Sequence, residues 1–291
     1  MKVVKGGIAF FDSGIGGLTV LNSCRKILKD EIIYYYGDNK RAPYGNLPNK
    51  QIERYVDKAF KLFKKLKVKA VVMACNTATA VCVDKLRKKY SFEIIGAEPA
   101  VLSAARKSDN VLVLTTKATY NSARFSNLCA RIKEEYPNVK LTLRACDNLA
   151  GEIEIHLLEK NYSYQKILPK ENPSIVVLGC THYIYIKEVI QAFYRCPTID
   201  GNDGIANRLQ LILTQKHAAK TKFWDERPLA VNLKQTNTKL SSLNIRNLKG
   251  IIANKCSWLS IPAIRNKKSQ IYFLGSGKRQ NKCIYEHMFE F

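Results

Sequence analysis

Short apolar runs alternate with amphipathic stretches over the first two thirds of the chain. Residues 68–75 (VKAVVMAC) are almost wholly apolar, as expected for a strand of a parallel sheet that is covered on both faces. Residues 50–67 instead repeat apolar side chains at helical spacing, which predicts an amphipathic helix. Regular alternation of the two patterns predicts βαβ units and a doubly wound α/β fold.

The same alternation predicts the remaining elements and two lobes. Strands are expected over 5–13, 31–38, 92–97, 110–116, 139–146, 174–180 and 271–277, and helices over 16–28, 78–90, 121–136, 149–159 and 183–194. A weak internal repeat supports two similar α/β lobes that face each other across a central cleft. Asp12 and Cys75 end strands in the first half, and Thr115 and Cys180 end strands 103 and 105 residues later.

We expect the first lobe to comprise residues 1–98 and about 205–291, and the second to comprise 99–204. Residues 216–270 are polar, basic and without clear periodicity, and they indicate an insertion or a loosely ordered segment.

The net charge of +24 is concentrated toward the C-terminus. Residues 205–291 contain sixteen Lys and Arg against four Asp and Glu, so this segment carries half of the excess charge. A basic surface attracts anions, including nucleic acids. However, the basic segment lacks the aromatic or glycine-rich interleaving of many single-strand and RNA-binding modules. A solvated, lysine-rich surface is the simpler interpretation, and nucleic-acid binding is the alternative.

The cysteines and the apolar runs bear on cellular location and on metal binding. The nine cysteines are unevenly spaced and form no CxxC pair, which favours free thiols, and the histidines show no zinc-type spacing. No apolar run reaches eighteen residues, so no membrane span is expected. The N-terminus does not have the pattern of a signal peptide, and we therefore expect a cytoplasmic protein.

Short polar side chains follow several of the predicted strands. Examples are FDSGIGG (11–17), ACNTAT (74–79) and LGCTHY (178–183). Because open α/β sheets bind ligands at the carboxyl ends of their strands, we expect these turns to surround one cleft. FDSGIGG lacks the GxGxxG spacing, so by itself it is a weak signal. Its glycines could let a ligand approach the backbone at a helix N-terminus, which attracts anions, or they could form only a tight turn with an Asp or Ser cap.

Cys75 and Cys180 are the strongest candidates for chemistry. Each follows a buried strand and precedes a predicted helix, a position that lowers the pKa of a thiol. Two such thiols on opposed lobes could remove a proton from one face of a carbon and deliver a proton to the other face. Asp12 and His182 could each assist one thiol. Taken singly, each cysteine is more often a small buried hydrophobic residue.

Four motifs, in order, resemble glutamate racemase: DSGIGGLTV (12–20), GDNKRAPYG (37–45), ACNTATA (74–80) and GCTHY (179–183). The resemblance covers roughly residues 6–212. It implies interconversion of L- and D-glutamate without a cofactor or metal, which supplies D-glutamate for peptidoglycan. It also makes a homodimer the default expectation. The alternatives are an aspartate racemase-type enzyme and a racemase relative that has lost its activity.

The resemblance also assigns roles to individual residues. Cys75 would act on D-glutamate and Cys180 on L-glutamate, with Asp12 and His182 as their assistants. The family's site glutamate corresponds to Glu154 by an ungapped count, or to Glu152 with a small shift. The segment around them, ACDNLAGEIE, lacks the family's two prolines, and Ile184 replaces the proline that usually follows GCTHY. The expected substrate-binding residues are Ser13, Asp38, Pro43, Tyr44, Gly45, Asn76, Thr77, Thr116, Thr119 and Thr181.

Overall fold

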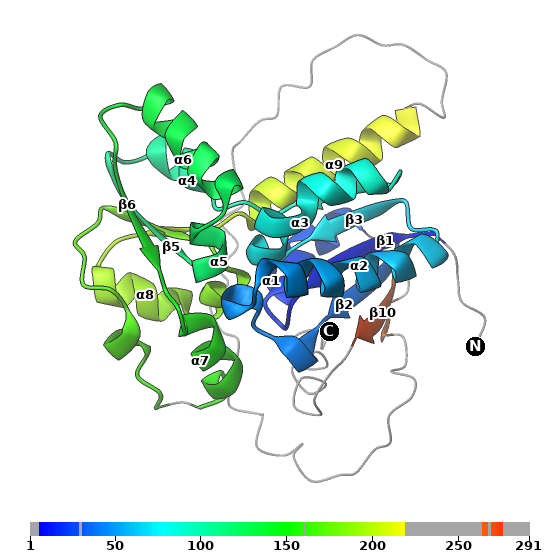
Figure 1. The fold of residues 1–291 in the computed structure, drawn as a ribbon, viewed down its shortest axis with the longest axis horizontal. Helices are drawn as coiled ribbons and strands as arrows, with labels where there is room; N and C mark the ends of the chain where they lie inside the picture. Colours follow the sequence, from blue (N-terminus) through cyan, green and yellow to red (C-terminus); the bar gives the residue numbers. More distant parts are fainter. Residues whose placement is uncertain (1–5, 29–30, 160, 219–263, 267–268, 276–291) are drawn as a thin grey trace.

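The computed structural model describes residues 6–28, 31–159, 161–218, 264–266 and 269–275. Two α/β lobes lie side by side, each built on its own sheet (Figure 1). We call the lobe that contains strand β1 the first lobe and the lobe that contains β5 the second lobe. The predicted fold class of two α/β lobes is confirmed. The boundaries at residues 98/99 and 204/205 stay predictions.

The first lobe has a six-stranded sheet in the order β4-β3-β1-β2-β10-β9. All neighbouring pairs are parallel except β9 and β10, which are antiparallel. The central strand β1 places Ile8 opposite Ile33 of β2 and opposite Ala70 of β3. The strands are β1 (Ile8–Asp12), β2 (Ile32–Gly37), β3 (Ala70–Met73), β4 (Glu93–Gly96), β9 (Ile264–Asn266) and β10 (Ser269–Gly275).

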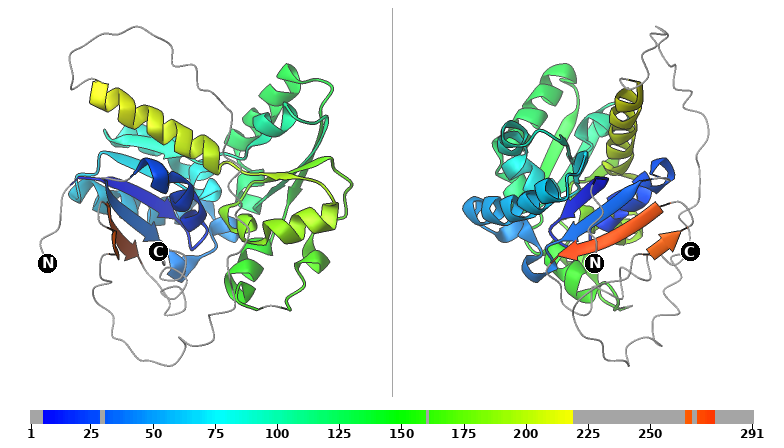
Figure 2. Two further views of the ribbon diagram at one scale, coloured as in Figure 1. Left: turned by 180° about the vertical axis from the view of Figure 1, so that it is seen from behind. Right: turned by 90° about the vertical axis from the view of Figure 1, so that its right-hand side faces the viewer.

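Helices cover both faces of this sheet because successive strand residues point to opposite sides. Ile8 and Phe10 of β1 pack in one core cluster with α1 (Gly17–Cys24) and α9 (Asn202–Ala218). Ala9 and Phe11 pack on the other side with α2 (Asn49–Lys65) and α3 (Asn76–Lys89). The view from behind shows α9 crossing this first lobe (Figure 2).

The second lobe has a four-stranded parallel sheet in the order β6-β5-β7-β8. Its strands are β5 (Asn110–Thr115), β6 (Lys140–Ala145), β7 (Ile175–Leu178) and β8 (Thr198–Ile199). One face packs against α7 (Leu149–His156), the 3₁₀ helix η5 (Thr181–Ile186) and α8 (Lys187–Tyr194). The other face packs against α4 (Val101–Ala105) and α6 (Ala123–Glu135).

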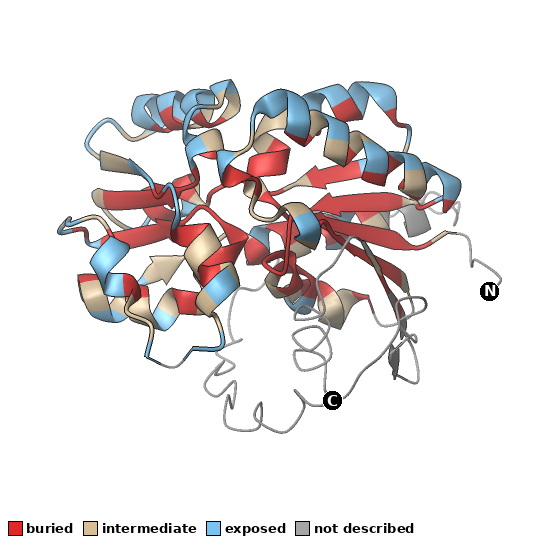
Figure 3. Ribbon diagram, turned by 60° about the horizontal axis from the view of Figure 1, so that its bottom comes forward, coloured by how far each residue is buried: buried red, intermediate tan, exposed pale blue. Residues whose placement is uncertain are grey.

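Short helices occupy several of the connections. They are η1 (Arg25–Ile27), η2 (Asn39–Arg41), η3 (Tyr44–Asn46), α5 (Lys117–Tyr120) and η4 (Tyr164–Ile167). In Figure 3 the strands are largely coloured as buried, while the outward turns of the helices are exposed. No helix among the described residues is long and apolar enough to span a bilayer.

Three expectations need correction or a narrower statement. The helix predicted over 183–194 is divided, because η5 precedes α8 and begins already at Thr181. Helix α9 was not predicted, and it extends into the segment assigned to an insertion, since 216–218 form its last residues. Residues 264–266 and 269–270 of that segment belong to strands, while 219–263 and 267–268 lie outside the described residues.

We expect Leu209→Ala to lower the free energy of unfolding by about 2–5 kcal/mol. Leu209 is fully buried in the core cluster that attaches α9 to the first sheet, so truncation leaves a cavity. Leu211 on the same helix is 53% exposed, and Leu211→Ala should change stability by no more than about 0.5 kcal/mol. Urea unfolding of both variants measures the difference. Equal losses would contradict this packing of α9.

Candidate active site

The carboxyl ends of strands from both sheets meet at the boundary between the lobes. Asp12 is the last residue of β1, Cys75 lies two residues beyond β3, and Cys180 lies two residues beyond β7. The Thr181 hydroxyl donates a hydrogen bond across the boundary to Asp12 Oδ2, at 3.2 Å. The two predicted cysteine motifs are therefore brought to one place, although they are more than a hundred residues apart.

Cys75 is the N-cap of α3. Its Sγ accepts a hydrogen bond from Ala78 N at 3.4 Å and lies 3.6 Å from Ser13 Oγ. Only 5% of the residue is exposed. Burial, followed by the negative charge of Asp12, raises the pKa of the Cys75 thiol to about 12. The predicted lowering of this pKa is wrong, because the Ala78 N–H does not offset desolvation.

Cys180 contacts a buried pair formed by a histidine and a carboxylate. Its Sγ lies 3.7 Å from His182 Nδ1, and His182 Nε2 lies 2.7 Å from Glu154 Oε1. Burial alone would lower the pKa of His182. The hydrogen bonds with Cys180 and Glu154 and their negative charges outweigh burial, and they raise this pKa well above its ordinary value. These interactions therefore favour the protonated form of His182.

Asp12 lies on the Cys75 side of this arrangement. It is fully buried, and Oδ1 accepts a hydrogen bond from Gly14 N at 2.9 Å. Burial raises the pKa of Asp12 to about 6, even though the charge of His182 acts in the opposite direction. Asp12 can therefore change its protonation state near neutral pH, within electrostatic reach of the Cys75 sulfur.

The structure separates the two candidate glutamates. Glu154 Oε1 contacts His182 and also accepts a hydrogen bond from Ile15 N of the first lobe, at 3.3 Å. Glu152 points elsewhere on α7: it accepts a hydrogen bond from the Tyr162 hydroxyl and lies 3.4 Å from His156 Nε2. Glu154 is therefore the glutamate that lies at the candidate site.

Three predicted threonines form a second link between the lobes. Thr77 Oγ1 of α3 and Thr116 Oγ1 lie 2.8 Å apart, and Thr116 Oγ1 donates a hydrogen bond to Thr119 Oγ1 at 3.1 Å. Gly45 comes so close to Thr116 that an added Cβ would lie 3.0 Å from the threonine Cβ. A residue larger than glycine at position 45 would have to displace this neighbour.

Asp38 and Tyr44 lie together at the end of β2. The Tyr44 hydroxyl donates a hydrogen bond to Asp38 Oδ2 at 2.6 Å, and Arg41 forms an ion pair with Asp38 Oδ1 at 2.6 Å. Burial, together with the charge of Asp38, raises the pKa of Tyr44. Pro43 faces the second lobe, because a Cβ on Gly151 of α7 would lie 3.8 Å from Pro43 Cγ.

Two buried polar atoms lie at the site without a partner among the described residues. They are Asn76 Oδ1 and Thr115 Oγ1. Asn76, Cys180 and Thr181 border a cavity of about 10 Å³. That is room for about one water molecule. An amino acid is far larger than this cavity, and Cys75 and Cys180 are only 5% and 7% exposed, so the lobes must separate before one can reach both sulfurs.

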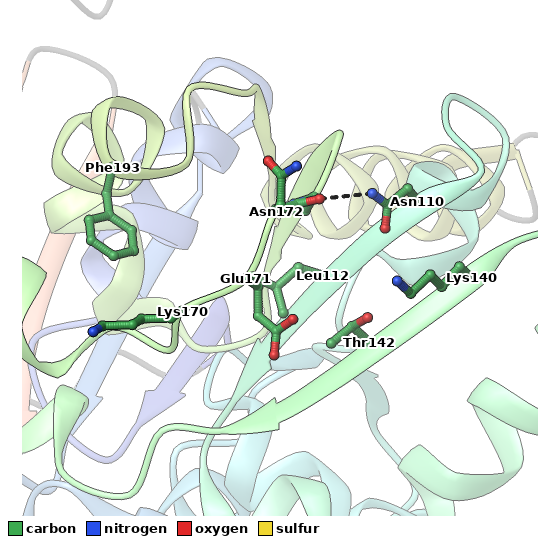
Figure 4. Close-up of a pocket in the computed structure, with 9 residues that line it drawn as sticks. Asn110, Leu112, Lys140, Thr142, Lys170, Glu171, Asn172 and Phe193 are labelled. Atoms are coloured by element: carbon green, nitrogen blue, oxygen red, sulfur yellow. Dashed lines mark hydrogen bonds between the residues drawn. The ribbon is translucent and has the colours of Figure 1, made fainter.

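A larger pocket, of about 470 Å³, lies elsewhere in the second lobe (Figure 4). Asn110 and Lys140, at the start of β5 and β6, line it together with Lys170 and Phe193. It is therefore at the amino ends of the strands, opposite the edge where α/β sheets bind their ligands. None of the predicted site residues lines it, and we place the candidate site at the carboxyl ends.

Two side chains at the site were not predicted from the sequence. Arg41 pairs with Asp38, and the Tyr185 hydroxyl donates a hydrogen bond to Ile15 O at 2.7 Å. Neither position carries a sequence signal, since both contacts depend on the fold. Within the described ranges no group of three or more His, Cys, Asp and Glu could hold a metal ion. Most of the basic segment behind the nucleic-acid alternative lies outside those ranges.

Residues 18–209 match the Asp/Glu/hydantoin racemase family. The chain is 38% identical to the glutamate racemase of Clostridium perfringens over 221 residues, which cover 72% of this chain and 84% of that protein.

Solved structures of glutamate racemases are also similar. The Escherichia coli enzyme in complex with L-glutamate and the activator UDP-MurNAc-Ala has a TM-score of 0.65 at 28% identity, covering 72% of this chain and 83% of that one. The Francisella tularensis enzyme in complex with D-glutamate has a TM-score of 0.63 at 27% identity, covering 73% and 82%.

We expect Asp12→Asn to gain stability relative to the wild type as the pH rises. Because the pKa of Asp12 is raised by folding from 3.8 to about 6, its contribution is fully present below pH 3.8 and is lost as the pH passes about 6. Asparagine does not titrate. Between pH 4 and pH 7 the difference in unfolding free energy should therefore shift toward the variant by about 2 kcal/mol. Urea unfolding at several pH values measures this shift. A difference independent of pH would contradict it.

Proposed function

The chain belongs to the Asp/Glu/hydantoin racemase family, and we propose that it is a glutamate racemase that uses Cys75 and Cys180 as its two acid–base groups. It is an isomerase that acts on an amino acid. The relatives that carry the name glutamate racemase, and the solved enzymes with L- and D-glutamate bound, support glutamate as the substrate.

The observation that carries the proposal is the pairing of the two thiols. Each ends a strand of a different sheet, and each has its own ionisable neighbour: Asp12 on the Cys75 side, and His182 on the Cys180 side. The Thr181 hydroxyl joins the two halves through its bond to Asp12. Two acid–base groups on separate lobes suit a reaction that exchanges protons on opposite faces of one carbon.

In the proposed direction from L- to D-glutamate, Cys180 acts as the base. Its thiolate removes the α-proton, and the electron pair stays on the α-carbon as the carbanionic species. The Cys75 thiol then donates its proton to the opposite face, which gives D-glutamate and a Cys75 thiolate. The reverse reaction exchanges the two roles. The raised pKa of Cys75 agrees with a thiol that remains protonated until it donates its proton as the acid.

Neighbouring groups would assist the two thiols. Protonated His182, held by Glu154, provides a positive charge beside Cys180, and Asp12 can accept or return a proton on the Cys75 side. The unpartnered Asn76 Oδ1 is an acceptor that suits the substrate ammonium group. Hydroxyls such as those of Thr77 and Thr181 are donors that suit its carboxylates. Groups fixed in advance in this way lower the cost of charge development in the transition state.

The α-proton of glutamate is only weakly acidic, so its carbanion is difficult to form. The closed site helps to form it. Cys75 and Cys180 are only 5% and 7% exposed, so water is largely excluded from both sulfurs. Electrostatic interactions between the substrate and the surrounding dipoles are stronger in such an environment than in water. Cys75 and Cys180 therefore supply both proton transfers. We propose that the product, D-glutamate, is used for peptidoglycan.

Deuterium incorporation tests the two-base mechanism. With L-glutamate in D₂O, product D-glutamate formed early should carry solvent deuterium, while the remaining L-glutamate should keep its α-proton. The reason is that different thiols remove and return the proton. Mass spectrometry of the separated enantiomers measures this. Substrate-derived hydrogen in the product would point to one base and would contradict the proposal.

Substitution of each thiol tests its role, and Cys82→Ala is the matched control. Cys75→Ala and Cys180→Ala should each lower kcat for racemisation at least about 10³-fold, the scale expected for loss of an acid–base group. Cys82→Ala should remain active, because Cys82 is buried in the core behind the site and has no role in the reaction. Circular dichroism follows the racemisation. Full activity in Cys75→Ala or Cys180→Ala would rule out the assignment.

Complementation tests the substrate and the biological role together. Expression of this chain should restore growth, without added D-glutamate, to a bacterium that lacks its own glutamate racemase, and Cys75→Ala should not. The purified protein should racemise glutamate far faster than aspartate. Preferential turnover of aspartate, with no rescue, would favour the aspartate-type alternative. A homodimer stays the default prediction, to be checked by light scattering.

A further inference from the structure

The second lobe contacts both backbone polar atoms of Ile15, which belong to two successive peptide units. Glu154 Oε1 accepts a hydrogen bond from Ile15 N at 3.3 Å, and the Tyr185 hydroxyl donates one to Ile15 O at 2.7 Å. From the first lobe, the Tyr35 hydroxyl donates to Gly14 O at 2.8 Å. The glycine-rich turn is therefore fixed by side chains from both lobes.

Tyr185 packs against both lobes, so its position depends on how the two lobes are placed relative to each other. Its half-buried ring packs against the core cluster of the first lobe that contains Leu18. The same ring packs against the core cluster of the second lobe that contains Tyr183. It lies on η5, three residues after His182. Its hydroxyl bond to Ile15 thus crosses the boundary beside the Cys180 half of the site.

The turn that Tyr185 holds has no space to move toward the second lobe. A Cβ on Gly14 would lie 2.0 Å from Glu154 Oε1, and a Cβ on Gly16 would lie 2.9 Å from His182 Nδ1. The backbone is therefore already in close contact with the groups that face Cys180. A small displacement of the turn would change the hydrogen bond that Ile15 N donates to Glu154, and with it the support of His182.

We propose that Tyr185 is a positioning residue for the proton transfer at Cys180. Its hydroxyl holds the Ile15 carbonyl and thereby keeps the backbone of the turn where the Ile15 N–H faces Glu154. Glu154 in turn orients His182 toward the Cys180 sulfur. This inference rests on the proposed two-cysteine function. It requires that loss of the hydroxyl affect the Cys180 step selectively, whereas a simple tether between the lobes would affect both proton transfers alike.

Tyr185→Phe tests this inference because it removes only the hydroxyl and keeps the ring. Tyr194→Phe is the matched control: its hydroxyl also donates to a backbone carbonyl, Pro169 O at 2.6 Å, but both partners lie within the second lobe. We expect kcat/KM to fall about fivefold to tenfold in Tyr185→Phe, the scale of one lost hydrogen bond. It should fall equally for both enantiomers, since their equilibrium constant is one. Tyr194→Phe should leave kcat/KM unchanged.

Isotope effects distinguish positioning from tethering. In Tyr185→Phe the primary isotope effect on kcat/KM with α-deuterated L-glutamate should rise above the wild-type value, because the Cys180 step has become slower. The effect with α-deuterated D-glutamate should fall, because the Cys75 step then limits the rate less. These effects are ratios, so they do not depend on the fraction of folded protein.

Several outcomes would overturn the inference. One is that the isotope effects of Tyr185→Phe equal those of the wild type. Another is that the isotope effects of Tyr185→Phe fall with both α-deuterated substrates. A third is that kcat/KM falls as much in Tyr194→Phe as in Tyr185→Phe. If the wild type racemises glutamate and Tyr185→Phe has the same kcat/KM and isotope effects, the role of Tyr185 is rejected but the proposed function is not. A wild-type protein that does not racemise glutamate would reject the proposed function and this inference together.

Discussion

The arrangement depends on the hydrogen bonds that join the two lobes around the glycine-rich turn. A thiol from each sheet can act on one carbon only if the carboxyl edges of the two sheets are held against each other. The bonds of Thr181 to Asp12 and of Glu154 to Ile15 do this beside the sulfurs themselves. Glycine at positions 14 and 16 permits the contact, since a Cβ at either position would overlap the second lobe. The turn is only a weak signal in the sequence, and in the structure it is the surface that the second lobe contacts.

The two halves of the site differ in their electrostatics. Cys75 faces a buried carboxylate whose pKa is raised to about 6, whereas Cys180 faces a histidine whose pKa is raised by its hydrogen bonds with Cys180 and Glu154. The closed site is therefore suited to start with a protonated Cys75 thiol and a positive charge beside Cys180. Binding of a substrate must separate the lobes and then restore these contacts, so part of the binding energy goes into closing the site. Such use of binding energy is general among enzymes that exclude water from a difficult proton transfer.

Much of this could be predicted from the sequence, and the limits have physical causes. The strands could be identified because a parallel sheet with helices on both faces needs nearly continuous apolar runs, as in 68–75, and the polar strand ends directly follow these runs. Helix α9 was missed because exposed Leu211 lies between buried Leu209 and Ile212, which blurs the helical repeat. The pKa of Cys75 was predicted in the wrong direction because a local rule for helix N-termini ignores the desolvation of a buried thiol. Glu152 and Glu154 could not be separated, since only tertiary packing decides which one reaches His182. Tyr185 was missed for the same reason.

The central claim is that a single α-carbon binds between two sulfurs that approach it from opposite faces. A crystal structure of the wild-type protein with D-glutamate bound tests this most directly. We predict that the α-carbon lies between Cys75 Sγ and Cys180 Sγ, each within about 3.5 Å, with the lobes closed over it. Glutamate bound with both sulfurs on the same face of its α-carbon, or bound away from one of them, would contradict the account.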